Sequence, residues 1–207
     1  MFITFEGPEG SGKTSQIRLL IAYLHRQGIP ALATREPGGT SIGDQIRLCL
    51  HDVRNVEMTA VTEILLYSAS RAQLVRQVIQ PALAAGQIVL CDRYADSTIA
   101  YQGYGRQLDL SVLQQITHFA TGGLQPNLTI LLDIAVERGL ARRRTNAEEM
   151  NRLDLEAIAF HERVRQGYHQ LAQADPTRWV CLDADRPLEL VQADLQQIIL
   201  ARRPRAD

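Results

Sequence analysis

The amino-acid sequence predicts an α/β fold in which helices cover both faces of a parallel sheet of about five strands. Short apolar runs of strand length alternate with segments of helical periodicity along the whole chain. Each apolar run ends in polar or glycine-rich residues, which in a parallel sheet meet at the edge where ligands bind. The chain has 207 residues and no repeat or linker that would divide it, so we expect a single domain over residues 1–207.

The N-terminal part of the chain supplies two strands and a helix. Residues 2–5 are an apolar run with the length of a buried strand. Residues 13–27 carry apolar side chains at the spacing of one helical face, and Gly28 ends that helix. Residues 31–33 form the second predicted strand, which leads into a Pro-Gly-Gly loop at 37–39.

The rest of the chain continues the alternation. Residues 57–83 have a helical pattern that contains Pro81 near its end and breaks at Gly86. Three more apolar runs and a final helical pattern follow, before a solvated tail at 202–207. These elements are the strands at 88–91, 128–132 and 179–182 and a C-terminal helix from Pro187.

Charge and composition argue against several kinds of partner. The formal net charge is -1, so no basic field draws the chain to nucleic acid or to anionic lipid. No apolar run approaches the roughly 18 residues that span a bilayer, and the first residues form a strand and a loop rather than a signal peptide, so we expect a cytoplasmic protein. Cys49, Cys91 and Cys181 have no metal-ligand spacing, and we expect buried, reduced thiols.

A phosphate-binding loop follows the first strand. Residues 7–14 fit the pattern G-x-x-x-x-G-K-[ST] between a predicted strand and a predicted helix. Small residues let successive N–H groups wrap a phosphate, and the following helix aims its positive end at the same anion. Lys13, the only lysine among 22 basic residues, is expected to bridge the β- and γ-phosphates, and the Thr14 hydroxyl to bind Mg²⁺. The expected ATP-binding residues are Gly7, Pro8, Glu9, Gly10, Ser11, Gly12, Lys13 and Thr14.

A phosphate loop alone leaves kinases, GTPases and motor ATPases open, and three further segments narrow the choice. They read TREPGGT at 34–40, YSASR at 67–71, and DRY at 92–94 continuing to YQG at 101–103. Together with the loop they resemble thymidylate (dTMP) kinase, in particular the bacterial type, of the P-loop nucleoside monophosphate kinase family. The resemblance implies a P-loop NTPase-like sheet with a short mobile lid. It also implies transfer of the ATP γ-phosphoryl group to dTMP with Mg²⁺, giving dTDP and ADP for dTTP biosynthesis.

Two residues that end the strand at 88–91 are candidates for the acceptor phosphate. Arg93 can direct two N–H groups onto a monophosphate, and Asp92 can hold Mg²⁺ through water or orient the acceptor oxygen. A strand-end ion pair is the structural alternative for both. By resemblance, Arg47 also reaches the acceptor phosphate, unless it is a solvated residue of its helix. Arg35 either supports the loop at 37–39 or touches substrate.

The resemblance also assigns a thymidine pocket. Tyr67 matches an aromatic residue that stacks on thymine, although the family more often has Phe there, and Arg71 matches an arginine that bonds the base carbonyl. Packing in the core is the alternative for Tyr67. The remaining candidates are Thr98 and Gln102 at the base, Tyr101 near the 2′ position of the sugar and Glu9 at the 3′-hydroxyl, with a structural polar role as the alternative for each.

An arginine-rich segment at about 138–152 is the expected lid. Charge runs are usually solvated helix faces, but bacterial members of the family resemble each other in carrying a catalytic arginine in the lid. The phosphate loop of this chain has no arginine at positions 8, 9 or 11, so the charge must come from elsewhere. The candidates are Arg142, Arg144 and Arg152, and the sequence does not choose among them.

The resemblance implies a homodimer, formed through helices such as that at 57–83, with ATP and dTMP as the small-molecule partners. Adenine is expected near Asp183 to Arg186. Two alternatives remain at this stage. One is another nucleoside or nucleotide kinase, and the other is a nucleotide-binding switch without a phosphoryl acceptor. A GTPase is disfavoured because no lysine beyond Lys13 can form an Asn-Lys-x-Asp motif.

Overall fold

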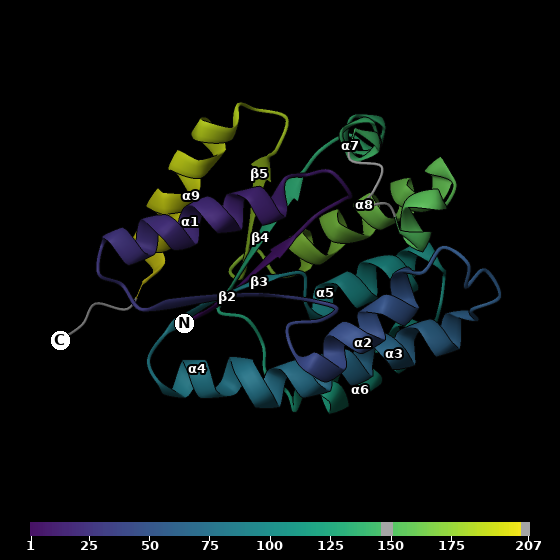
Figure 1. Cartoon of the computed structure of the whole chain (residues 1–207). Helices are drawn as coiled ribbons and strands as arrows, with labels where there is room; N and C mark the ends of the chain where they lie inside the picture. The colour runs from purple at the N-terminus through teal and green to yellow at the C-terminus, as the bar shows by residue number, and fades with distance from the viewer. Residues whose placement is uncertain (146–150, 204–207) are drawn as a thin grey trace.

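The computed structural model describes residues 1–145 and 151–203. Its centre is a sheet of five parallel strands in the order β2-β3-β1-β4-β5, so the predicted α/β class and strand number are confirmed. The strands lie edge-on between helices in Figure 1. They are β1 (Phe2–Glu6), β2 (Ala31–Arg35), β3 (Ile88–Asp92), β4 (Leu128–Asp133) and β5 (Trp179–Asp183).

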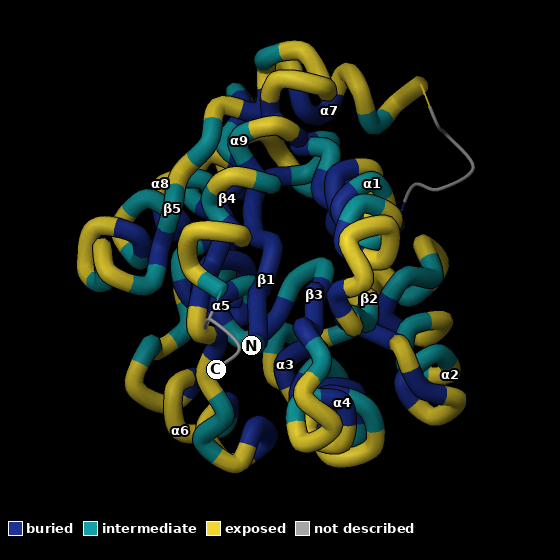
Figure 2. The backbone as a smooth tube through the Cα atoms, turned by 90° about the vertical axis from the view of Figure 1, so that its left-hand side faces the viewer, coloured by how far each residue is buried: buried dark blue, intermediate teal, exposed yellow. Residues whose placement is uncertain are grey.

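Alternate residues of the inner strands enter different apolar clusters, because successive side chains of a strand point to opposite faces. On one face, Ile3 and Phe5 of β1 pack against α1 (Lys13–Arg26) and α9 (Leu188–Arg202). On the other face, Phe2 packs with α3 (Ala60–Leu74), η1 (Val75–Ile79) and α4 (Gln80–Ala84). Figure 2 shows the resulting buried centre and exposed outer helices.

Two of the remaining helical segments, η2 (Ile99–Gly105) and α8 (Ile158–Ala174), pack together on the second face of the sheet and bury Tyr101, Leu131 and Tyr168. The others include α2, which follows the 37–39 loop, and α7, which begins the expected lid. Their bounds are α2 (Ser41–His51), α5 (Ala95–Thr98), α6 (Leu110–Thr121), α7 (Val136–Arg144), η4 (Arg152–Leu155) and α8 (Ile158–Ala174).

The long helix predicted over 57–83 differs in detail. It begins at Ala60, widens into a π-helical turn at Val75–Ile79 and continues as α4, where Pro81 stands in the first turn. Ile79 and Gln80 both keep right-handed helical dihedral angles, so α4 continues η1 past Pro81 without a break. The second strand also extends two residues further than predicted, to Arg35.

The expectation of three buried thiols is wrong for two of them. Cys91 is buried, but Cys49 and Cys181 are exposed. Cys181 lies on β5, which is an edge strand with a neighbouring strand on one side only. Within the described residues, no helix is both long and apolar enough to cross a membrane. Residues 146–150 of the expected lid and 204–207 of the expected tail lie outside the described part.

Candidate active site

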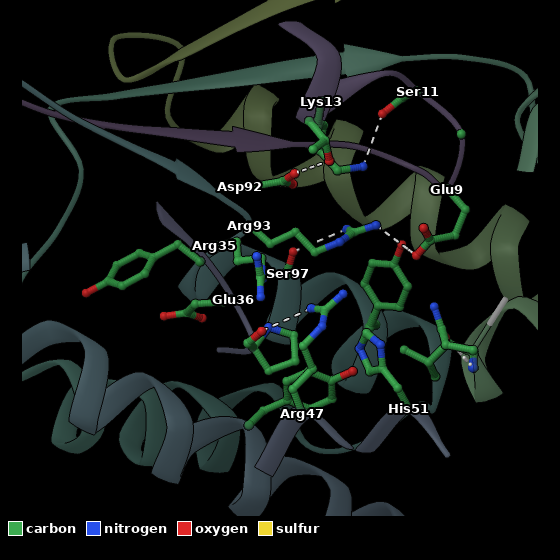
Figure 3. Close-up of a pocket in the computed structure, with 18 of the residues that line it drawn as sticks. Glu9, Ser11, Lys13, Arg35, Glu36, Arg47, His51, Asp92, Arg93 and Ser97 are labelled. Carbon is green, nitrogen blue, oxygen red and sulfur yellow. Dashed lines mark hydrogen bonds and ion pairs between the residues drawn. The ribbon is translucent and has the colours of Figure 1, made fainter. Parts of the chain in front are cut away.

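The sheet topology brings the phosphate loop and the strand-end pair of β3 together. Because β1 lies directly between β3 and β4, the loop after β1 runs beside Asp92 and Arg93 at the same edge. A cleft of about 700 Å³ opens there, between the loop, α2, α3 and η2. Figure 3 shows the residues converging on it. Its walls include Glu9, Lys13, Thr14, Arg47, Tyr67, Arg71, Asp92, Arg93, Thr98, Tyr101, Gln102 and Arg142.

At two places the phosphate loop both has a backbone conformation that favours glycine and leaves no room for a Cβ. Gly7 and Gly10 have φ values of 142° and 70°, in the left-handed range. A Cβ at Gly7 would overlap the carbonyl oxygen of Leu132, and one at Gly10 would overlap the carbonyl oxygen of Gly139 in α7. Helix α1 then begins at Lys13 without a side-chain cap, so its first N–H groups remain available to an anion.

Lys13 is buried at the centre of the loop. Its ammonium donates to the carbonyl oxygens of Gly7 at 3.0 Å and Pro8 at 2.9 Å, and to the Ser11 hydroxyl at 3.1 Å. Burial, together with the nearby charge of Arg93, lowers the pKa of Lys13 to about 8. A phosphate that replaced these neutral acceptors would favour the charged ammonium, so ligand binding and the positive charge of Lys13 reinforce each other.

Two oxygen ligands expected for a divalent cation lie side by side. The Thr14 hydroxyl donates to a carboxylate oxygen of Asp92 at 2.6 Å. Mg²⁺ prefers oxygen ligands and usually binds through one or two protein groups together with water and substrate phosphates. Within the described residues no cluster of three or more His, Cys, Asp or Glu side chains forms a cation cage. The pair therefore fits a cation that arrives with a nucleotide.

Arg93 points from the end of β3 toward the phosphate loop. Its guanidinium donates to Glu9 at 2.8 Å and to the Gly7 carbonyl oxygen at 3.1 Å, and it lies 4.9 Å from the ring centroid of Tyr101. The Tyr101 hydroxyl donates to the same oxygen of Glu9 at 2.8 Å. Burial opposes the charge of Glu9, but Arg93 and Lys13 outweigh it and hold the pKa of Glu9 at about 2. The predicted residues Glu9, Arg93 and Tyr101 thus form one contiguous group.

Arg71 belongs to a buried ion pair that the sequence analysis did not identify. Its guanidinium donates to Glu36 through Nε at 2.8 Å, to the Thr98 hydroxyl at 2.9 Å and to the Tyr94 carbonyl oxygen at 3.0 Å. Both partners of the ion pair are almost fully buried. Tyr67 lies one helical turn before Arg71 on α3, and both line the cleft, so the structure brings together the two residues expected at the base.

Gln102 leads to a second buried carboxylate that was not anticipated. Its amide donates to Glu63 at 2.8 Å, and Glu63 also accepts from Arg106 and Arg152. Arg152 is buried in this cluster and lies outside the walls of the cleft, unlike Arg142. Arg144 is exposed at the end of α7, also outside these walls. Of the three lid candidates, the structure thus brings only Arg142 to the site.

Arg142 also borders a smaller pocket beside the phosphate loop. Its guanidinium donates to the Ala184 carbonyl oxygen at 3.0 Å and to Asp185 at 2.8 Å. The pocket has a volume of about 180 Å³ and adjoins Gly12. Its other walls are Ser11, Gln16, Ala184, Arg186, Leu188 and Val191, which include part of the segment expected to hold adenine.

Arg47 and His51 approach the cleft from α2. Arg47 donates to the Pro37 carbonyl oxygen at 3.0 Å, which also supports the loop at 37–39. Burial and the charge of Arg47 lower the pKa of His51 to about 3, so this imidazole is neutral. Arg35 lies on the wall of the cleft and pairs with Asp44 at 3.3 Å. His51 is a wall residue that no motif indicated, and Arg143 is a wall residue of the expected lid that was not among the candidates.

Comparison with known proteins identifies one family by both sequence and structure. A family model described as thymidylate kinase matches residues 5–195. A thymidylate kinase from Roseiflexus sp. is 50% identical over 210 residues, which cover 96% of this chain and 93% of the relative. One from Thermomicrobium roseum is 55% identical over 190 residues, which cover 92% and 90%. The crystal structure of thymidylate kinase from Ehrlichia chaffeensis matches with a TM-score of 0.78 and 31% identity, covering 96% of this chain and 98% of that one.

Proposed function

The chain belongs to the thymidylate kinase family and transfers the γ-phosphoryl group of ATP to dTMP, and from that premise we propose how its residues divide the work between the two nucleotides. The phosphate loop holds the ATP phosphates, with Lys13 between the β- and γ-phosphates. Arg93 and Arg47 hold the dTMP phosphate. The observation that carries this assignment is the convergence of Lys13 and Arg93 on one cleft.

The chemistry needs no covalent intermediate with the enzyme. An oxygen of the dTMP phosphate attacks the γ-phosphorus of ATP, and the bond to the bridging oxygen of ADP breaks. Both reactants are anions, so the protein must bring them into line and offset their charge. Positioning of this kind can supply about 7–11 kcal/mol of the barrier. The cations Lys13 and Arg93 supply the compensating charge, and both lie within hydrogen-bond distance of the Gly7 carbonyl oxygen at the edge of the cleft.

Mg²⁺ is the proposed cofactor. Thr14 and Asp92 would hold it, directly or through water, because their oxygens are adjacent at the mouth of the phosphate loop. The ion supplies charge compensation on the ATP phosphates when it is bound. Thr14 and Asp92 themselves orient the end of β3 relative to the start of α1, which fixes Arg93 beside the loop.

Residues 138–152 are the proposed lid, with Arg142 as its catalytic arginine. Arg142 is supported over Arg144 and Arg152 because it alone of the three lines both the cleft and the pocket beside Gly12. It would meet the oxygens of the transferring group. The same 180 Å³ pocket is the proposed adenine site. Closure over the site would exclude water, which competes with dTMP as phosphoryl acceptor.

Tyr67, Arg71, Thr98 and Gln102 form the proposed thymine pocket, with Glu9 and Tyr101 at the deoxyribose. Arg71 is a donor that remains charged, so it suits a carbonyl oxygen and rejects an amino group. The methyl group that distinguishes dTMP from dUMP contributes only about 1–3 kcal/mol to discrimination. A hydrogen-bond donor left unpaired in the pocket by dCMP lowers the rate by a much larger factor. We therefore expect some turnover of dUMP and almost none of dCMP.

The test is ADP release from ATP with dTMP, dUMP and dCMP in turn. Wild-type enzyme should use dTMP best, and Arg71→Ala should raise the KM for dTMP with little change in the KM for ATP. Turnover of dCMP at the rate of dTMP, or an unchanged KM for dTMP in Arg71→Ala, would refute the base assignment. The ATP parameters of the same variant serve as the internal control.

A homodimer is the proposed assembly, with an interface on α2, α3 and α6. These helices pack together at one end of the molecule (Figure 1), and they carry large exposed apolar side chains. Leu48 on α2 is 73% exposed, and Phe119 on α6 is 85% exposed. Exposed apolar surface of this extent on neighbouring helices is typical of an interface. The other members of this surface are Ile42, Val61, Leu65 and Val112.

A further inference from the structure

Glu6 is a buried carboxylate immediately before Gly7 of the phosphate loop, and the mechanism above gives it no role. It is the last residue of β1, it is 0% exposed, and it is not part of the cleft wall. Burying an acidic side chain is costly unless its oxygens are fully hydrogen-bonded. The partners of Glu6 therefore indicate what the carboxylate does.

Each hydrogen-bond partner of Glu6 is either bonded to Arg93 along the backbone or in contact with its guanidinium. One oxygen of the carboxylate accepts from the backbone N–H of Tyr94 at 2.9 Å. The other accepts from the hydroxyls of Ser97 at 2.5 Å and Tyr168 at 2.9 Å. Both hydroxyl oxygens in turn face the guanidinium of Arg93, Tyr168 at 3.2 Å and Ser97 at 3.5 Å. Glu6 thus lies one hydrogen bond behind Arg93.

The direction of these hydrogen bonds depends on the carboxylate. A hydroxyl has one proton, and a guanidinium only donates. The hydroxyls of Ser97 and Tyr168 lie 2.9 Å apart and can bond each other, but a carboxylate is the stronger acceptor for both protons. When both protons point to Glu6, both oxygens turn their lone pairs to Arg93. A neutral amide in place of Glu6 would donate to one hydroxyl and turn a proton toward the guanidinium.

Glu6 also secures the backbone on which Arg93 stands. Arg93 has a φ of 67°, which is uncommon for a residue with a side chain. Its own N–H donates to the Phe5 carbonyl oxygen at 2.9 Å, and the next N–H, that of Tyr94, donates to Glu6. The end of β1 therefore holds the peptide groups on both sides of Arg93.

We infer that Glu6 is a positioning residue for the acceptor phosphate: through Ser97, Tyr168 and the Tyr94 amide it fixes the direction in which Arg93 presents its guanidinium. The inference rests on the proposed role of Arg93. It predicts that neutralising Glu6 impairs use of dTMP and leaves the binding of ATP nearly unchanged, because the hydrogen bonds of Glu6 lead to Arg93 rather than to Lys13.

The test compares Glu6→Gln, Tyr168→Phe and their double variant by steady-state kinetics with each substrate varied. Burial and the charge of Asp96 raise the pKa of Glu6 to about 7, so assays at a pH of about 8 keep the wild-type carboxylate ionised. Glu6→Gln should lower kcat/KM for dTMP by about tenfold or more and change the KM for ATP by less than about twofold. Tyr168→Phe should show the same selective loss, to a smaller extent.

The double variant separates positioning from general destabilisation. If Glu6 acts through Tyr168, the double variant loses less than the product of the two single losses. Thr4→Val is the matched control, because it removes a buried hydroxyl of the same strand that is paired with Thr129 at 3.0 Å rather than with Arg93. It should keep the wild-type kcat/KM for dTMP. If Glu6→Gln does not fold, Tyr168→Phe alone carries the test.

Two results would overturn the inference. One is a kcat/KM for dTMP within about twofold of wild type in Glu6→Gln and Tyr168→Phe, and the other is an equal loss for ATP and dTMP. Arg93→Ala distinguishes this failure from failure of the proposed function. If Arg93→Ala itself spares dTMP, the assignment of Arg93 is at fault. If it abolishes use of dTMP while the Glu6 and Tyr168 variants do not, the assignment stands and only the inference fails.

Discussion

Arg71 is a proposed substrate-binding residue, and because it forms a buried ion pair with Glu36, replacing it should also lower the free energy of unfolding. The side chains of Arg71 and Glu36 are 1% and 3% exposed. Replacing Arg71 by Met keeps an unbranched apolar chain but leaves Glu36 in the interior without its cation. Removing one partner of a buried ion pair costs about 3–5 kcal/mol, because the remaining charge is uncompensated. That cost is a large part of the free energy of unfolding of a typical folded domain, which is about 5–15 kcal/mol.

The stability lost in Arg71→Met should depend on pH, because it comes from the buried charge of Glu36. Burial already raises the pKa of Glu36 in the presence of Arg71, and without Arg71 that pKa rises further. A carboxyl group whose pKa is higher in the folded state binds its proton more tightly there, so it destabilises the fold progressively as the pH rises above its unfolded value of about 4.3. The cost of Arg71→Met should therefore be smallest in acid and reach its full size near neutrality.

Urea unfolding of wild type and Arg71→Met between acid and neutral pH measures this directly. The control is Arg35→Met, because the Arg35–Asp44 pair is about half exposed, at 56% and 49%, and such pairs contribute about 1 kcal/mol or less. Adding Glu36→Gln to Arg71→Met should recover part of the loss, since the amide carries no charge. A loss below about 1 kcal/mol, or one that does not change with pH, would show that Glu36 is not an uncompensated buried charge.

The other predictions concern the metal, the lid and the assembly. Thr14→Val and Asp92→Asn should each raise the Mg²⁺ concentration for half-maximal rate several-fold in a metal titration, and an unchanged titration would argue against that pair. Arg142→Ala should lower kcat by about a hundredfold or more, while Arg144→Ala stays within about twofold; the reverse order would make Arg144 the catalytic residue. Phe119→Asp should give a monomer in sedimentation velocity, because it places a charge in the proposed apolar interface, and a dimer that persists would move the interface elsewhere.

The sequence predicted those parts of the structure that depend on neighbouring residues. The phosphate loop is such a case, since its glycines, its lysine and the flanking strand and helix all lie within a short segment. The strand-end pair Asp92-Arg93 was found in the same way. Glu36 and Glu63 were missed, because each meets its arginine only through tertiary packing, at separations of 35 residues for Glu36 with Arg71 and 89 for Glu63 with Arg152.

The local sequence pattern also does not predict which cysteine side chains are exposed to solvent. Cys91 and Cys181 both stand in apolar runs, yet one lies on an inner strand and the other on the edge of the sheet. For the same reason the sequence did not predict which of Arg142, Arg144 and Arg152 reaches the cleft. They differ in the direction in which α7 and η4 carry them, and an arginine-rich run contains no information on that direction.

The contact between Gly10 and Gly139 sets how closely α7 approaches the phosphate loop. There the backbone of the phosphate loop touches the backbone of α7, with no space for even a methyl group between them. A side chain at either glycine would therefore push the loop and the helix apart. Arg142 stands about one helical turn after Gly139, so the same contact sets how far its guanidinium lies from the phosphate loop.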